Sequence, residues 1–175
     1  MPDFWIWYDN NYITITNNTF INNPCGIDII GDNHHRIIDN NKFQNNKNGV
    51  VIRNDDHDSV HHFSITNNVF EINKNTGLSL HFTTDSIISQ NTFINNNLEV
   101  TLYKAKGNKI TKNNFIGNTK HATFRYYEKR EKCYWRNNYW DNWFKFFPIP
   151  RPIKSVVRYY NMWGEPYDTR WYKID

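Results

Sequence analysis

The chain has 175 residues, 29 of them asparagine, and 21 basic against 17 acidic residues give it a net charge of +4. No apolar run reaches the roughly 18 residues that a membrane-spanning helix needs, and two cysteines are too few for a disulfide scaffold. Aromatic residues make up 17% of the sequence, which argues against a disordered chain because so many rings need a core.

The first predicted element is an apolar strand at residues 4–7, in which Phe4 and Ile6 match Ile27 and Ile29 one repeat later. The sequence therefore begins inside a repeat, and its first residues lack the basic-then-apolar order of a signal peptide. Solenoids normally carry a terminal cap that protects the edge of the core. We therefore expect a longer protein whose upstream part supplies further coils and an export signal.

A seven-residue motif then recurs six times, with its aromatic anchors 23, 27, 23, 22 and 25 residues apart. The copies are NNTFINN (17–23), NNKFQNN (40–46), NNVFEIN (67–73), QNTFINN (90–96), KNNFIGN (112–118) and NNYWDNW (137–143). Their anchors are Phe20, Phe43, Phe70, Phe93, Phe115 and Trp140. A repeat of this length is typical of a solenoid in which each unit forms one coil.

Two columns of asparagine accompany the anchors. Stacked amides can hydrogen-bond to the equivalent amide or backbone one coil away, so we predict two asparagine ladders. The first contains Asn18, Asn41, Asn68, Asn91, Asn113 and Asn138, and the second contains Asn23, Asn46, Asn73, Asn96 and Asn118. A column of large apolar residues lies five positions before the anchors, at Ile15, Ile38, Ile65, Ile88, Ile110 and Trp135.

A short alternating strand follows each second asparagine, as in Ile27-Asp28-Ile29 and Leu78-Ser79-Leu80. Gly26, Gly49 and Gly77 precede three of these strands, where glycine makes a tight corner easiest. The pattern predicts an all-β fold, a right-handed parallel β-helix of about six coils over residues 1–143. A flat sandwich would need hairpin turns and a different spacing. In the coil register Cys25 and Cys133 lie about 20 Å apart, too far for a disulfide, so both are expected to be free packing residues.

The segments NNTFINNPCGIDII and NNYWDNW resemble the Asn-rich parallel β-helix repeats of secreted archaeal and bacterial proteins. That broad group includes NosD-like periplasmic proteins and carbohydrate-binding or sugar-hydrolysing domains. The resemblance covers residues 3–143 and implies the fold, while the recurring motif carries no catalytic residue.

The C-terminal segment, residues 144–175, breaks the repeat with FFPIPRPI, NMWGEPYD and RWYKID. We expect it to fold over the last coil as an aromatic cap. The alternative is a platform on which sugar rings stack, since an aromatic face complements the apolar face of a pyranose.

Two loops that follow the alternating strands are rich in histidine and aspartate. They read DNHH at 32–35 and NDDHDSVHH at 54–62, and the second lengthens its coil to 27 residues. Stacked loops bring equivalent positions together, so a divalent transition metal could bind there, although the fold itself requires no cofactor. The candidate ligands are His34, His35, Asp55, Asp56, His57, His61 and His62, with Asp85 as a further neighbour. The alternative is a solvated loop without fixed geometry.

The outward strand positions offer no two carboxylates on adjacent coils, which argues against a glycosidase groove. We therefore expect a non-catalytic extracellular or cell-surface domain that presents a rigid face to carbohydrate or another envelope component. The alternative is a fragment of a polysaccharide lyase, hydrolase or epimerase whose groove lies in missing coils. Residues 1–103 carry 5 basic and 11 acidic residues, and residues 104–175 carry 16 and 6, so the basic end could approach an anionic polymer. The absence of a nucleic-acid motif argues against DNA or RNA.

Overall fold

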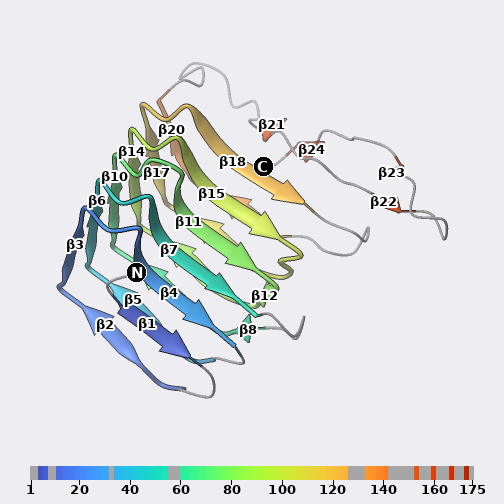
Figure 1. Cartoon of the computed structure of the whole chain (residues 1–175). Helices are drawn as coiled ribbons and strands as arrows, with labels where there is room; N and C mark the ends of the chain where they lie inside the picture. The colour runs from blue at the N-terminus through green and yellow to red at the C-terminus, as the bar shows by residue number, and fades with distance from the viewer. Residues whose placement is uncertain are drawn as a thin grey trace.

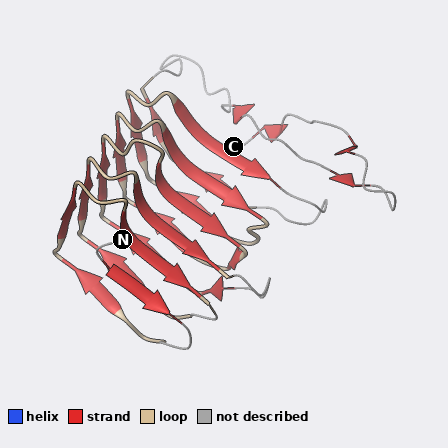
Figure 2. Cartoon of the chain, viewed as in Figure 1, coloured by secondary structure: helices blue, strands red, loops and turns tan. Residues whose placement is uncertain are grey.

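The computed structural model describes residues 4–7, 11–31, 34–54, 60–125 and 133–141, together with four two-residue strands between positions 152 and 173. Every regular element in these residues is a strand, and short turns join the strands (Figure 2). No helix in this part of the chain is long and apolar enough to cross a membrane.

Three six-stranded sheets, here called A, B and C, form the sides of a solenoid (Figure 1). Sheet A contains β1 (Phe4–Trp7), β4 (Cys25–Ile30), β7 (Asn48–Arg53), β11 (Thr76–His81), β15 (Leu98–Tyr103) and β18 (Lys120–Arg125). Sheet B contains β2 (Thr14–Thr16), β5 (Ile37–Asp39), β9 (Ser64–Thr66), β13 (Ile87–Ser89), β16 (Lys109–Thr111) and β19 (Tyr134–Arg136). Sheet C contains β3 (Thr19–Ile21), β6 (Lys42–Gln44), β10 (Val69–Glu71), β14 (Thr92–Ile94), β17 (Asn114–Ile116) and β20 (Tyr139–Trp140).

The chain visits sheets A, B and C in turn and then returns to A one coil later, so about five full turns separate β1 from β18. Neighbouring strands in each sheet are parallel, because every strand meets its equivalent in the next coil running the same way. The predicted parallel β-helix is confirmed.

The aromatic anchors form one column inside the solenoid. Ring centroids of the five phenylalanines lie 4.7–5.1 Å apart in successive coils, with ring planes within 16° of parallel. Trp140 continues the column at 4.1 Å from Phe115. The rings of Phe43, Phe70, Phe93 and Phe115 are fully buried, so the column is the apolar axis of the fold.

Each asparagine doublet has two different structural roles. The first residue adopts a left-handed backbone conformation, with φ of 60°, 53° and 54° at Asn17, Asn40 and Asn67. Asparagine is among the few residues that adopt this conformation readily. The second residue directs its amide into the coil, and Asn68 is only 1% exposed. The doublets therefore account for the unusual asparagine content.

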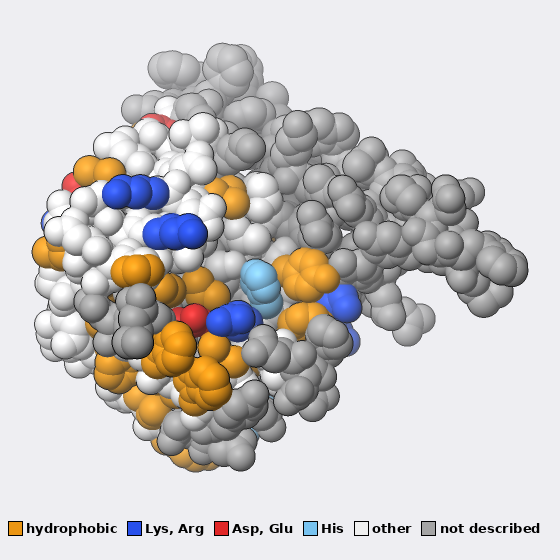
Figure 3. Space-filling model, in the orientation of Figure 1, with side chains coloured by type: hydrophobic (Ala, Val, Ile, Leu, Met, Phe, Trp, Pro, Cys, Tyr) orange, Lys and Arg blue, Asp and Glu red, His pale blue; other side chains and the backbone are white. Residues whose placement is uncertain are grey.

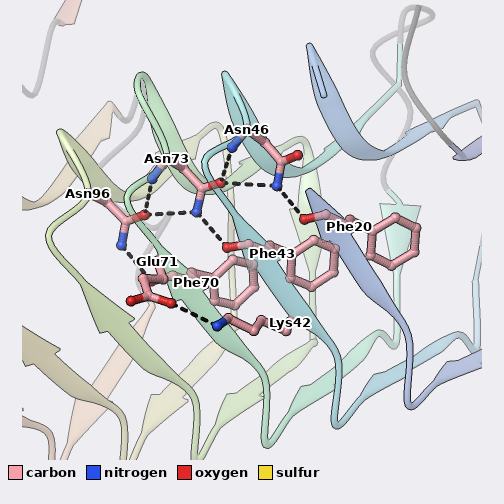
Figure 4. Close-up of polar contacts among 8 residues, drawn as sticks. All are labelled: Phe20, Lys42, Phe43, Asn46, Phe70, Glu71, Asn73 and Asn96. Carbon is pink, nitrogen blue, oxygen red and sulfur yellow. Dashed lines mark hydrogen bonds and ion pairs between the residues drawn. The ribbon is translucent and has the colours of Figure 1, made fainter. Parts of the chain in front are cut away.

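The inner asparagines hydrogen-bond between coils. The backbone N–H of Asn68 donates to Oδ1 of Asn91 at 2.9 Å, and Nδ2 of Asn68 donates to the carbonyl of Ile38 at 2.8 Å. Figure 4 shows the same pattern in the second column, where Asn73 donates to Asn96 at 2.9 Å and to the Phe43 carbonyl at 3.1 Å. Each of these buried amides thereby hydrogen-bonds to polar groups of both neighbouring coils.

The glycines at the start of the sheet A strands have a role that the sequence did not predict. Gly49 lies inside β7 without a left-handed φ, so a tight corner is not the reason for it. A Cβ at this position would lie 2.4 Å from the Gly77 carbonyl oxygen and 2.9 Å from the Phe70 ring. Glycine is needed here because the backbone of the next coil and the aromatic column approach too closely for a side chain.

The C-terminal segment contributes two short antiparallel pairs to the described structure. β21 (Pro152–Ile153) pairs with β24 (Tyr172–Lys173), and β22 (Tyr159–Tyr160) pairs with β23 (Pro166–Tyr167). The rest of residues 144–175 lies outside the described residues, and the cap over the last coil stays a prediction.

Candidate functional site

The corner between sheets A and B departs from the asparagine pattern. The left-handed residue two positions before each sheet B strand has φ between 50° and 70°, and in successive coils this residue is Tyr12, His35, His62, Asp85 and Gly107. The residues just before them include His34 and His61, which form a parallel bridge. The backbone of this corner repeats from coil to coil, while its side chains change from tyrosine to histidine to aspartate.

Four histidine rings meet at this corner. His34 stacks on His61 with ring centroids 4.8 Å apart and planes 5° from parallel, and His35 stacks on His62 at 4.9 Å and 17°. Within one coil, the rings of His61 and His62 meet edge to face at 4.7 Å, and those of His34 and His35 at 5.5 Å. The four side chains therefore form a two-by-two array, here called the histidine quartet.

The structure thus brings together four of the residues that the sequence proposed as metal ligands. Asp85 continues the column of His35 and His62 one coil later. Asp55, Asp56 and His57 lie outside the described residues, so their share in a site stays a prediction.

The quartet contains one pair of converging ring nitrogens. Nδ1 of His61 lies 2.6 Å from Nδ1 of His62. In the described part of the chain, no three His, Cys, Asp or Glu side chains are placed as ligands of a single metal ion. Burial raises the pKa of the Cys25 thiol to about 12, which keeps it protonated and makes it a poor metal ligand. The candidate donors at the corner between sheets A and B are therefore imidazole nitrogens and the Asp85 carboxylate.

The outward side of sheet A forms a second candidate site (Figure 3). Trp5 and Trp7 of β1 point outward, are 49% and 51% exposed, and stack with ring centroids 5.5 Å apart. Figure 3 shows hydrophobic side chains gathered on this face, with an acidic, a basic and a histidine side chain beside them. We call this surface the A face.

Polar pairs continue the A face from β4 to β15. Arg53 forms an ion pair with Asp28 at 3.3 Å, and the Ser79 hydroxyl lies 3.0 Å from Nε2 of His81. The His81 ring lies 5.4 Å from the Tyr103 ring. Burial, and secondarily the charge of Arg53, lowers the pKa of His81 below its ordinary value. The imidazole is consequently a neutral hydrogen-bonding group at neutral pH.

Comparison with known protein families gives a match for the coiled part of the chain. A family model described as "Periplasmic copper-binding protein (NosD)" matches residues 3–144. The chain belongs to the NosD family. The match has almost the same limits as the resemblance over residues 3–143 and confirms it. Among the curated proteins and the solved structures, none matches the chain significantly.

The sequence did not predict part of the A face of this NosD-family chain. The predicted strands were three residues long, but β4, β7, β11 and β15 are each six residues long. The extra length adds a second outward column that contains Trp7, Ile30, Arg53, His81 and Tyr103. Extension of the inward–outward alternation by one residue beyond each predicted strand was the signal that could have revealed it.

A third feature is a shallow recess of about 270 Å³ at the corner between sheets B and C. Its lining includes the turn residues Asn17, Asn40 and Asn67, together with Lys42. Lys42 also forms an ion pair with Glu71 at 3.0 Å (Figure 4). The recess follows from the turn geometry of this corner and presents amide groups to solvent.

Proposed function

We propose that the chain is a non-catalytic domain of the cell envelope that binds carbohydrate on the A face. The stacked and exposed pair of Trp5 and Trp7 is the observation that carries the proposal. An aromatic surface complements the apolar face of a sugar ring, and tryptophan loses little conformational entropy on binding. The periplasmic description of the NosD family supports an envelope location.

The polar groups of the A face suit the hydroxyl groups of a sugar chain. Asp28 and Arg53 lie on neighbouring strands, and the Ser79 and His81 pair lies on the next strand. Neighbouring strands are separated by about 4.8 Å, so successive coils offer hydrogen-bonding groups at intervals along an extended polymer. The parallel β-helix holds these groups in a rigid row.

The carboxylates argue for binding without hydrolysis. Asp28 is the acidic residue among the described outward positions of β1, β4, β7, β11 and β15, and Arg53 neutralises it. Glu99 of β15 is fully buried and lies away from the exposed surface. Glycoside hydrolysis uses two carboxyl groups about 5–9.5 Å apart, which this face does not offer in the described residues.

A glycan array tests the proposal with the purified chain and a Trp5→Ala, Trp7→Ala variant. Loss of both rings should weaken binding by at least about 10-fold, since each aromatic contact contributes on the order of 1 kcal/mol. Tyr134→Ala is the matched control, because Tyr134 is 60% exposed on sheet B. Equal binding by all three proteins, or binding by none of them, would refute carbohydrate recognition by the A face.

Copper binding is a second candidate function, and the family description and the histidine quartet favour it. Imidazole is a good copper ligand, and the quartet supplies imidazole at an exposed corner. We propose that this NosD-family chain binds a copper ion, with Asp55, Asp56 and His57 as further candidate ligands from the sequence. Isothermal titration of the full chain with copper sulfate tests this function, and the absence of saturable binding would refute it.

A further inference from the structure

We infer that the A face binds a neutral, linear polysaccharide that lies along the solenoid axis and crosses the strands from Trp7 of β1 to His81 of β11. The inference rests on the proposed carbohydrate-binding function and adds the class of glycan, its direction on the surface and the role of His81. It depends on where the groups of the A face lie, because the stacked rings share one strand and the polar groups lie on the strands that follow.

The register of sheet A places one part of the A face on each successive strand. Asp28 of β4 pairs with Trp5 of β1, and Arg53 of β7 lies one strand further and forms the ion pair with Asp28 at 3.3 Å. His81 comes next, because β11 pairs with β7. Figure 3 shows an acidic, a basic and a histidine side chain next to one another, with hydrophobic side chains on both sides of them. A ligand that contacts all of these groups must therefore run across the strands.

The separation of β1 and β11 sets a minimum length for such a ligand. Three strand spacings of about 4.8 Å lie between these strands, which gives about 14 Å along the solenoid axis. A pyranose ring is about as long as one strand spacing, so about four consecutive sugar units are needed to reach from Trp7 to His81. A disaccharide can stack on the tryptophans without reaching His81.

The charges along this row favour a neutral glycan. The carboxylate of Asp28 and the guanidinium of Arg53 compensate each other in their ion pair. Burial, and secondarily the charge of Arg53, lowers the pKa of His81, so its imidazole is neutral at neutral pH. The ammonium group of Lys104, which follows β15, lies 5.0 Å from the centroid of the Phe82 ring. Sugar hydroxyl groups can therefore hydrogen-bond along the row without placing a charge against an unpaired charge of the A face.

Neighbouring side chains orient the imidazole of His81 at the far end of the row. Nε2 of His81 lies 3.0 Å from the Ser79 hydroxyl, and its ring lies 5.4 Å from the Tyr103 ring. Nδ1 is the second nitrogen of the ring that can hydrogen-bond. A side chain held in this way loses little conformational entropy when it binds a hydroxyl group. His81 is therefore the residue that makes binding depend on the length of the glycan.

Isothermal titration of the full chain with oligosaccharides of two lengths tests the inference. The ligands are cellohexaose, xylohexaose and chitohexaose, each with its disaccharide, and hexagalacturonate as the anionic counterpart. At least one neutral hexasaccharide should bind about 10-fold more tightly than its disaccharide, as expected for one or two added hydrogen bonds. His81→Ala should abolish this advantage, and Ser79→Ala should reduce it by removing the hydroxyl that orients the imidazole. Tyr134→Ala on sheet B is the matched control and should retain it.

The outcomes separate the inference from the function on which it rests. If Trp5→Ala with Trp7→Ala abolishes binding while His81→Ala keeps the preference for the hexasaccharide, the A face binds carbohydrate and the assigned direction is wrong. Equal affinity for both lengths, or tighter binding of hexagalacturonate than of every neutral ligand, would likewise overturn the inference alone. If neither these ligands nor the glycan array gives binding, the inference and the proposed function are both wrong. Circular dichroism of each variant confirms that the fold is retained.

Discussion

Two corners of the solenoid share a left-handed residue just before the next strand and differ in the side chains around it. At the corner between sheets B and C, left-handed residues such as Asn17, Asn40 and Asn67 precede an asparagine in every coil, and these asparagines are buried from Asn41 to Asn113. At the corner between sheets A and B, left-handed residues also recur, but the residues after them include Arg36 and Phe63. Asparagine is therefore favourable at a corner of this fold without being required there.

The corner between sheets A and B shows where the asparagine arrangement is lost. In the later coils, Ser86 donates its backbone N–H to Oδ1 of Asn108 at 2.9 Å, as at the other corner. One coil earlier, Phe63 donates to the Ser86 hydroxyl at 3.0 Å, and the histidine quartet lies beside it. Departures from a locally consistent pattern tend to mark functional sites. The histidine quartet therefore stays the candidate site of the proposed copper-binding function.

Phe70→Ala, in the aromatic column shared by all coils, should destabilise the fold most. The ring is fully buried between Phe43 and Phe93, at 4.9 and 4.7 Å, so its loss leaves a cavity in the aromatic column. The free energy of unfolding should fall by about 3–5 kcal/mol. Urea denaturation measures the change, with Ile21→Ala as control because Ile21 is 46% exposed. Similar losses in both variants would contradict the importance of the column.

Asn68→Ala tests the predicted ladder with a smaller expected effect. Removing the amide leaves the Asn41 backbone N–H and the Ile38 carbonyl without their partner, and should cost roughly 1–3 kcal/mol. Asn67→Gly is the matched control, since glycine adopts the left-handed conformation readily and should change stability by about 0.5 kcal/mol. Thermal unfolding compares the two, and an unchanged midpoint for Asn68→Ala would argue against the ladder.

His62→Asn tests whether the histidine at the corner between sheets A and B stabilises the fold or binds a ligand. Asparagine suits the left-handed conformation at this position, so the metal-free variant should stay within about 0.5 kcal/mol of the wild type. Chemical denaturation in the presence of a chelator measures this. A loss well above that value would mean that the His62 ring stabilises the corner itself.

The smallest expected effect concerns His81 on the A face. Burial and Arg53 hold the pKa of His81 below its ordinary value, so the unfolded chain binds a proton more readily than the folded chain. The free energy of unfolding should therefore fall as pH drops through about 6.5, where ordinary histidine titrates. His81→Asn, which keeps the neighbouring Ser79 and Tyr103, should remove this part of the pH dependence. An NMR titration midpoint at or above the ordinary value would contradict the assignment.

The repeating coils could be predicted from the sequence because equivalent positions in successive coils carry similar side chains. The spacing of Phe20, Phe43 and Phe70 predicted the register in which these strands pair. The sequence did not predict why Gly49 is a glycine, because the close approach of Gly77 belongs to the next coil. The pairing of His61 and His62 was also hidden, since it depends on a left-handed residue that sequence spacing does not reveal.

The hydrogen bonds from one asparagine to the next in each column all have the same direction. Asn41 donates its N–H to the amide oxygen of Asn68, and Asn68 donates in turn to Asn91. Each of these hydrogen bonds joins adjacent coils, so a change at one coil directly destabilises only the coils next to it. In the purified 175-residue chain the outermost coils should therefore open first, and amide hydrogen exchange should slow progressively toward the middle coils.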